Sequence, residues 1–111
     1  MIQQQTNNYI KICIKSWLLC ESCIYNEINS FSPRPELIEL CTECAKSCFA
    51  VVTRLVSNSD DLEYLPFNCL LDCLQCANAC RKYPELDLQD CADVFLMCAF
   101  EMKNLTVFSP N

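Results

Sequence analysis

Apolar residues recur every three or four positions through four stretches of the chain, and short polar or proline-containing segments separate these stretches. An α-helix turns about 100° per residue, so this spacing places the apolar residues of each stretch on one face. Pro35 and Pro66 suit the first turn of a helix, and Pro84 follows the end of another. The pattern predicts helices at about residues 8–29, 35–56, 66–82 and 86–105.

Each predicted helix carries cysteines on its apolar face. The face of the first helix consists of Ile10, Cys13, Trp17, Cys20, Cys23/Ile24 and Ile28, with Cys23 at its edge. The face of the second consists of Cys41, Cys44 and Cys48, followed by Val52 and Leu55. The face of the fourth consists of Leu88, Cys91, Phe95, Cys98, Met102 and Leu105.

The third predicted helix has the densest cysteine spacing. The cysteines of Cys69-Leu-Leu-Asp-Cys73-Leu-Gln-Cys76-Ala-Asn-Ala-Cys80 follow one another at intervals of 4, 3 and 4 residues. On a helix they fall within a stripe about 60° wide. The stretch contains no glycine, no proline and no run of β-branched residues, and Leu, Gln and Ala favour helix. It therefore predicts a helix with a continuous row of sulfur atoms along one side.

Four helices joined by short connections predict an all-α fold, an antiparallel (up-down-up-down) four-helix bundle in which residues 1–111 form a single domain. Because every cysteine stripe faces inward, the predicted core is lined by thiols. All twelve cysteines are candidate metal ligands: Cys13, Cys20, Cys23, Cys41, Cys44, Cys48, Cys69, Cys73, Cys76, Cys80, Cys91 and Cys98.

Three explanations compete for these rows of cysteine. Cysteine is a small apolar residue that fills cores, but four in a stretch of twelve residues exceed that role. Disulfides would have to join different helices, because neighbours on one helix have Cβ atoms about 5–6 Å apart and a disulfide needs about 3.5–4.5 Å. A soft metal ion, with bonds of about 2.3 Å, bridges sulfurs about 4–5 Å apart without moving the backbone. Geometry favours metal.

Composition removes most other functions. Without glycine the chain has no P-loop, dinucleotide fingerprint or nucleophile elbow, and without histidine it has no Cys–His pair and no mixed Cys/His zinc site. We therefore expect no enzyme. A net charge of −6 argues against nucleic acid and anionic membranes as partners. The sequence shows no signal peptide and no membrane-spanning run, so we expect a cytoplasmic protein with reduced thiols.

A second set of apolar residues points away from the cysteine faces and predicts a homo-oligomer, because a lone bundle would expose them. The set consists of Leu18, Leu19, Phe67, Leu70, Leu71, Leu74, Leu96, Met97 and Phe100. The alternative is that they are ordinary scattered surface residues.

Three features of the sequence carry a resemblance to a known family. They are the Cys-x3-Cys-x2-Cys-x3-Cys pattern of residues 69–80, the proline turn and cysteine-bearing helix that follow it, and the Cys-x2-Cys-x3-Cys pattern of residues 41–48. From Cys13 to Met102 the chain resembles the cysteine-rich four-helix-bundle copper storage proteins. The resemblance implies a homotetramer of bundles that stores Cu(I) on thiolates inside each bundle. The chain departs from the family pattern at Val94, where a further cysteine is expected, and in having no histidine near the bundle mouth. Met102 and Met1 remain as soft residues that pass copper inward, although Met102 is better explained as core.

Charge favours Cu(I) over zinc. Four thiolates on one Zn²⁺ leave a net charge of about −2 in a low-dielectric core, which is costly. Cu(I) is soft and takes two thiolates, and bridging thiolates bring the charge towards zero. We therefore expect several Cu(I) ions per chain, held for storage or sequestration. The alternatives are an iron–sulfur or zinc–thiolate protein, and a disulfide-stabilised helical interaction module.

The count of cysteines per helix predicts where copper is densest. Helices 35–56 and 66–82 supply seven thiols, with Cys20, Cys91 and Cys98 completing shared sites across the core. Cys13 and Cys23 are predicted to be the least essential ligands. Trp17 is expected to fill part of the interior, which would exclude metal at its level.

Overall fold

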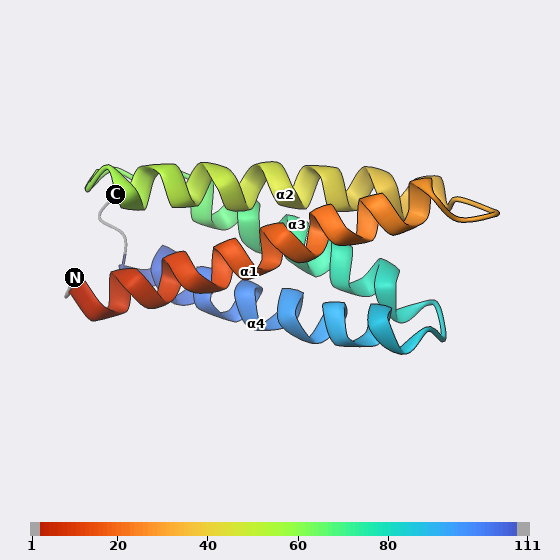
Figure 1. Ribbon diagram of the computed structural model, residues 1–111. Helices are drawn as coiled ribbons and strands as arrows, with labels where there is room; N and C mark the ends of the chain where they lie inside the picture. The colour runs from red at the N-terminus through yellow and green to blue at the C-terminus, as the bar shows by residue number, and fades with distance from the viewer. Residues whose placement is uncertain (1–2, 109–111) are drawn as a thin grey trace.

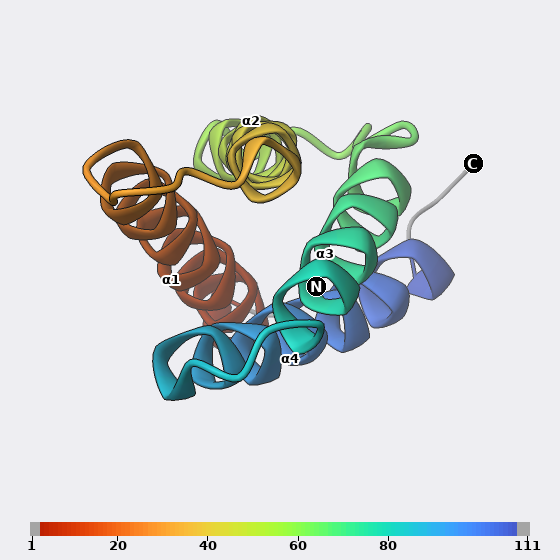
Figure 2. The same cartoon turned by 90° about the vertical axis from the view of Figure 1, so that its right-hand side faces the viewer.

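A computed structural model describes residues 3–108 of the chain, which form four helices and, within that range, no strand. The helices are α1 (Gln3–Ile28), α2 (Pro35–Val56), α3 (Leu65–Arg81) and α4 (Leu86–Phe108). In Figure 1 each helix returns in the direction opposite to the one before it. Figure 2, turned by 90°, shows the four helices arranged around a shared interior. The predicted all-α bundle with a cysteine core is confirmed.

Proline sets the starts of the central helices. Pro35 opens α2 with Glu36 in the first turn, where a carboxylate stabilises the positive helix end, and Arg54 lies in the last turn. Pro66 lies in the first turn of α3. Helix α1 begins earlier than the expected residue 8, and α4 continues past residue 105 to Phe108. Both extensions allow buried side chains near the helix ends, Tyr9 and Leu105, to pack within complete helical turns.

The type of residue that fills the core changes along the length of the bundle. Buried cysteines occupy its middle, and larger apolar side chains close its ends. At the end holding the start of α1 these are Tyr9, Leu55 and Leu105. At the other end they include Leu37 and Leu88. The thiols are therefore enclosed lengthwise by residues that do not bind metal.

One detail of the predicted α1 face is wrong. Ser16, not Trp17, is fully buried between Cys13 and Cys20, and Trp17 lies half-buried with its ring 5.7 Å from that of Phe49. Ile28, also expected inside, is exposed. Position 16 rather than 17 faces the interior, while Cys13 and Cys20 stay buried as predicted, because the large indole packs better across the α1–α2 seam than in the narrow cysteine core. Trp17 therefore does not block the interior.

The turn between α1 and α2 is fixed by a buried carboxylate. Glu27 accepts hydrogen bonds from the Arg34 backbone N–H at 2.9 Å, from Nε at 3.1 Å and from Nη2 at 2.7 Å. The Arg34 guanidinium also contacts Glu85 and lies 4.3 Å from the centre of the Tyr83 ring. Arg34 thereby ties the α1–α2 turn to the α3–α4 turn.

Replacing Glu27→Gln tests this connection. Hydrogen bonds from Arg34 lower the pKa of Glu27 below its ordinary value of 4.5. We expect a loss of about 1–3 kcal/mol in the free energy of unfolding at neutral pH. The wild-type advantage should begin to decline near pH 4.5 and disappear as the pH falls through the lower pKa of folded Glu27. Urea unfolding of the reduced protein across this pH range measures it.

Glu43→Gln is the matched control, because Glu43 forms only an exposed pair with Lys46. Surface pairs of this kind contribute about 0–1 kcal/mol. An equal loss in the two variants would contradict the assigned role of Glu27.

Candidate metal centre

Helices α2 and α3 present their cysteines to each other in matched pairs. The Sγ–Sγ distances are 3.4 Å for Cys41 and Cys76, 3.6 Å for Cys44 and Cys73, and 3.7 Å for Cys48 and Cys69. Each interval of three or four residues between cysteines on α2 matches an equal interval between cysteines on α3, read in the opposite direction. The mirrored spacing of the two motifs therefore produces rungs of sulfur between antiparallel helices.

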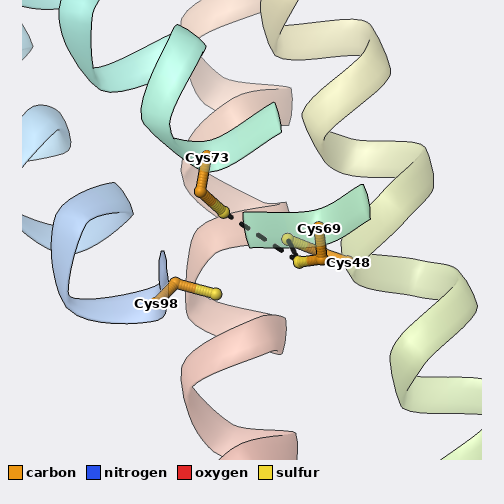
Figure 3. A group of neighbouring side chains, drawn as sticks. All are labelled: Cys48, Cys69, Cys73 and Cys98. Atoms are coloured by element: carbon orange, nitrogen blue, oxygen red, sulfur yellow. Dashed lines mark hydrogen bonds between the residues drawn. The ribbon is translucent and has the colours of Figure 1, made fainter. Parts of the chain in front are cut away.

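The pair formed by Cys48 and Cys69 belongs to a group of four sulfurs. The Sγ atoms of Cys48, Cys69, Cys73 and Cys98 all lie within 4.8 Å of one another and are all buried. Figure 3 shows these side chains converging from α2, α3 and α4. Four sulfurs around one ion with bonds of about 2.3 Å would lie about 3.8 Å apart. The group is thus close to the size that one thiolate-bound metal requires.

Three more sulfurs form a second buried group further along the bundle. The Sγ atoms of Cys20, Cys41 and Cys76, one from each of α1, α2 and α3, also lie within 4.8 Å of one another. Cys44 connects this group to the first, because its thiol interacts with Cys20 on one side and with Cys48 and Cys73 on the other. The sulfurs therefore form one continuous set rather than isolated sites.

Two α1 cysteines extend the set at its ends. The Cys13 thiol donates to the Met102 Sδ at 3.8 Å, and both side chains are fully buried. Met102 is thus a core residue with a sulfur contact, and Met1 lies outside the described residues. Cys23, expected at the edge of its stripe, is instead buried beside the thiols of Cys41 and Cys80.

The contacts between thiols move their pKa values in opposite directions. Hydrogen bonds from Cys23 and Cys76 lower the pKa of Cys80 to about 5, and those from Cys13, Cys48 and Cys73 lower the pKa of Cys69 to about 7. The same kind of contact raises the pKa of Cys48 far above its ordinary value. Each proton is shared between sulfurs, and a cation placed among them would replace these protons.

Cys91 differs from the other cysteines. All twelve are free thiols, and Cys91 alone is only partly buried while the other eleven are buried. Burial, followed by the charges of Cys80 and Cys41, raises its pKa to about 11. Val94, at the position where the family pattern expects a cysteine, is half-buried, and Phe95 next to it is fully buried. A cysteine at position 94 would therefore lie at the side of the core rather than in its centre.

A family model described as Csp, copper storage protein, matches residues 2–106. The chain belongs to the copper storage protein family. No significant match was found among curated proteins, and none among solved structures. Membership in the copper storage protein family implies copper storage, and the buried cysteine groups supply sulfur ligands suited to the metal. Among the described residues, no helix has both the length and the apolar character of a membrane span.

Ser16 is a residue of the cysteine-lined core that sequence reasoning missed. Its hydroxyl is fully buried and has no hydrogen-bond partner among the described residues. The signal in the sequence was its spacing, three residues after Cys13 and four before Cys20. Trp17, four residues after Cys13 and three before Cys20, has an equivalent spacing, so spacing alone did not separate the two positions.

We expect Ser16→Ala to stabilise the reduced, metal-free protein. The substitution removes a buried hydroxyl without a partner, whose desolvation costs about 1–3 kcal/mol. Ser22→Ala, at an exposed position of the same helix, measures the gain from helix propensity alone. Urea unfolding should show a larger increase for Ser16→Ala, and equal increases would contradict the assignment.

Proposed function

We propose that this protein stores copper as Cu(I), several ions per chain, bound to thiolates in the bundle core. The single observation that carries the proposal is the continuity of the sulfur contacts across α1, α2, α3 and α4. Cys44 joins the four-sulfur and three-sulfur groups, and Cys23, Cys80 and Cys91 extend them. All twelve cysteines are the proposed ligands.

Continuity favours Cu(I) over the alternative metals. A structural zinc site needs one closed tetrahedron of ligands, and it leaves the remaining thiols without a role. Thiolates that bridge several Cu(I) ions distribute the charge along the core, so less net charge is buried. Iron–sulfur clusters take four cysteines at defined sites, whereas these sulfurs form one extended set.

Anaerobic titration of the reduced protein with Cu(I), against a competing chelator, tests the proposal. We expect on the order of 6 Cu(I) per chain if each ion takes two thiolates, and up to ~12 if thiolates bridge. A parallel titration with Zn²⁺ is the control. Binding of one metal per chain, or tight Zn²⁺ binding without preference for Cu(I), would contradict copper storage as the role.

The two compact groups should hold most of the copper. We expect Cys73→Ser with Cys76→Ser to lose more bound Cu(I) than Cys13→Ser with Cys23→Ser. Cys73 and Cys76 each belong to a set of sulfurs within 4.8 Å of one another, and Cys13 and Cys23 belong to neither set. Each variant lacks two buried thiols, so the pair is matched. Equal losses would show that the compact groups do not locate the store.

The proposed role is storage without catalysis, in a reducing compartment such as the cytoplasm. Copper and disulfide formation would compete for the same sulfurs, and rungs of 3.4–3.7 Å bring those sulfurs close together. Reducing compartments keep such thiols free. This supports a cytoplasmic location for the filled protein.

We further propose that the bundles assemble as a homo-oligomer, and as a tetramer by likeness to the family. Its support is an exposed apolar surface on the adjacent helices α3 and α4. The surface consists of Phe67, Leu71, Leu74, Leu96, Met97 and Phe100. Leu19 and Leu70, expected outside with them, are partly buried against the core. Large exposed apolar surfaces are usually covered by another protein.

A further inference from the structure

Helices α1 and α4 separate towards one end of the bundle. Figure 2 shows the far end of α1 meeting α4 and its near end leaning away towards α2, and Figure 1 shows the same divergence from the side. Between them lies a cleft of about 420 Å³, whose lining includes Leu19, Cys23, Leu88, Cys91 and Val94. Two of the twelve thiols therefore line a space that opens to solvent.

The cleft leads from solvent to the sulfur core. Cys91, the one partly exposed cysteine, lies at its surface, and Cys23 is buried in its wall. The charges of Cys80 and Cys41 act on Cys91, and the Cys23 thiol interacts with both of those residues. Cys91 therefore lies near enough to Cys80 and Cys41 for their charges to act on it, and it shares the cleft lining with Cys23.

The charges around the cleft favour a cation. Asp87 and Asp90 lie in its lining and act on Cys91, with Lys15 as the opposing charge. Glu27 also lines the cleft, but its carboxylate is engaged by Arg34. Carboxylates beside a concave surface raise the local concentration of cations.

The opposite end of the core offers no comparable path among the described residues. Cys13 and Met102 are fully buried there, behind Tyr9 and Leu105. The third methionine, Met97, is exposed on the outer surface of α4 and lies outside the core. Sulfur reaches solvent from the core at the α1–α4 cleft.

We propose that the α1–α4 cleft is the site through which copper is loaded, with Cys91 as the first thiolate ligand and Cys23 as the second. The proposal rests on the proposed storage of Cu(I). In the loading step a bond forms between Cu(I) and the Cys91 sulfur, and the thiol proton passes to water. The bond between copper and its carrier ligand breaks, and copper stays Cu(I) throughout. Transfer to Cys23, and then to Cys41 and Cys80, follows by the same exchange.

The test compares the loading rates of two variants with changes in the cleft lining, one that removes a thiol and one that removes a hydroxyl. Reduced protein is mixed with the coloured Cu(I)–bicinchoninate complex, and the loss of its absorbance is followed by stopped flow. We expect Cys91→Ser to slow the transfer by about tenfold, the lower end of the effect of removing a residue that supports a metal site. Ser22→Ala, which removes an exposed hydroxyl from the same cleft lining and no proposed ligand, should load at close to the wild-type rate.

Total capacity separates this proposal from the storage proposal. If wild-type protein takes up several Cu(I) and both variants load equally fast, the cleft is not the loading site although storage stands. If wild-type protein binds no more than one Cu(I), storage itself fails.

Brief alkylation provides a second measurement that needs no variant. Iodoacetamide should modify Cys91 before the buried thiols, because it alone is partly exposed, and filling the protein with Cu(I) to its full capacity beforehand should protect it. Modification spread evenly over many cysteines, or a lack of protection at Cys91, would overturn the proposal.

Discussion

The structure depends on the fixed distance between cysteine sulfurs on one helix. Neighbours three or four residues apart have Cβ atoms too distant for a disulfide, and the sulfurs of Cys69 and Cys73 on α3 lie 4.0 Å apart. Across helices the contacts are shorter, and the sulfurs of Cys41 and Cys76 lie 3.4 Å apart. The thiols can therefore come together only if the helices are in register. The same helix register determines both the packing of the bundle and the arrangement of the sulfur atoms.

Register follows from the order of the intervals. Helix α2 places its cysteines at intervals of three and then four residues, and the first three cysteines of α3 follow at four and then three. Antiparallel helices with mirrored intervals meet at every cysteine, whereas a parallel pair would match at only some. Small cysteine side chains at these rungs let α2 and α3 approach closely without empty space, while a larger residue, Phe95, is buried on α4.

Much of this was predictable from the sequence because helical periodicity and proline are local signals. Pro35 fixed the start of α2, and the intervals of three and four fixed which cysteines share a face. The choice between Ser16 and Trp17 was not local, since it depends on whether an indole fits better inside the core or against Phe49. The burial of Glu27 likewise required Arg34, which lies beyond the helix that contains the carboxylate. Contacts between helices decided each position where the prediction was wrong.

The two ends of the core differ in the polar groups that lie beside them. At one end Tyr9 and Leu105 close over Cys13 and Met102. At the other, Leu37 and Leu88 close the core, and the ion pairs of Arg34 with Glu27 and Glu85 tie the α1–α2 turn to the α3–α4 turn. A buried ion pair contributes little net stability compared with apolar packing. The role of this ion pair is geometric, because it connects the α1–α2 turn to the α3–α4 turn. The Cys91 thiol stays partly exposed to solvent beside these turns. The proposed loading cleft lies beside this end, where the core is closed lengthwise by Leu37 and Leu88 but Cys91 lines a space between α1 and α4.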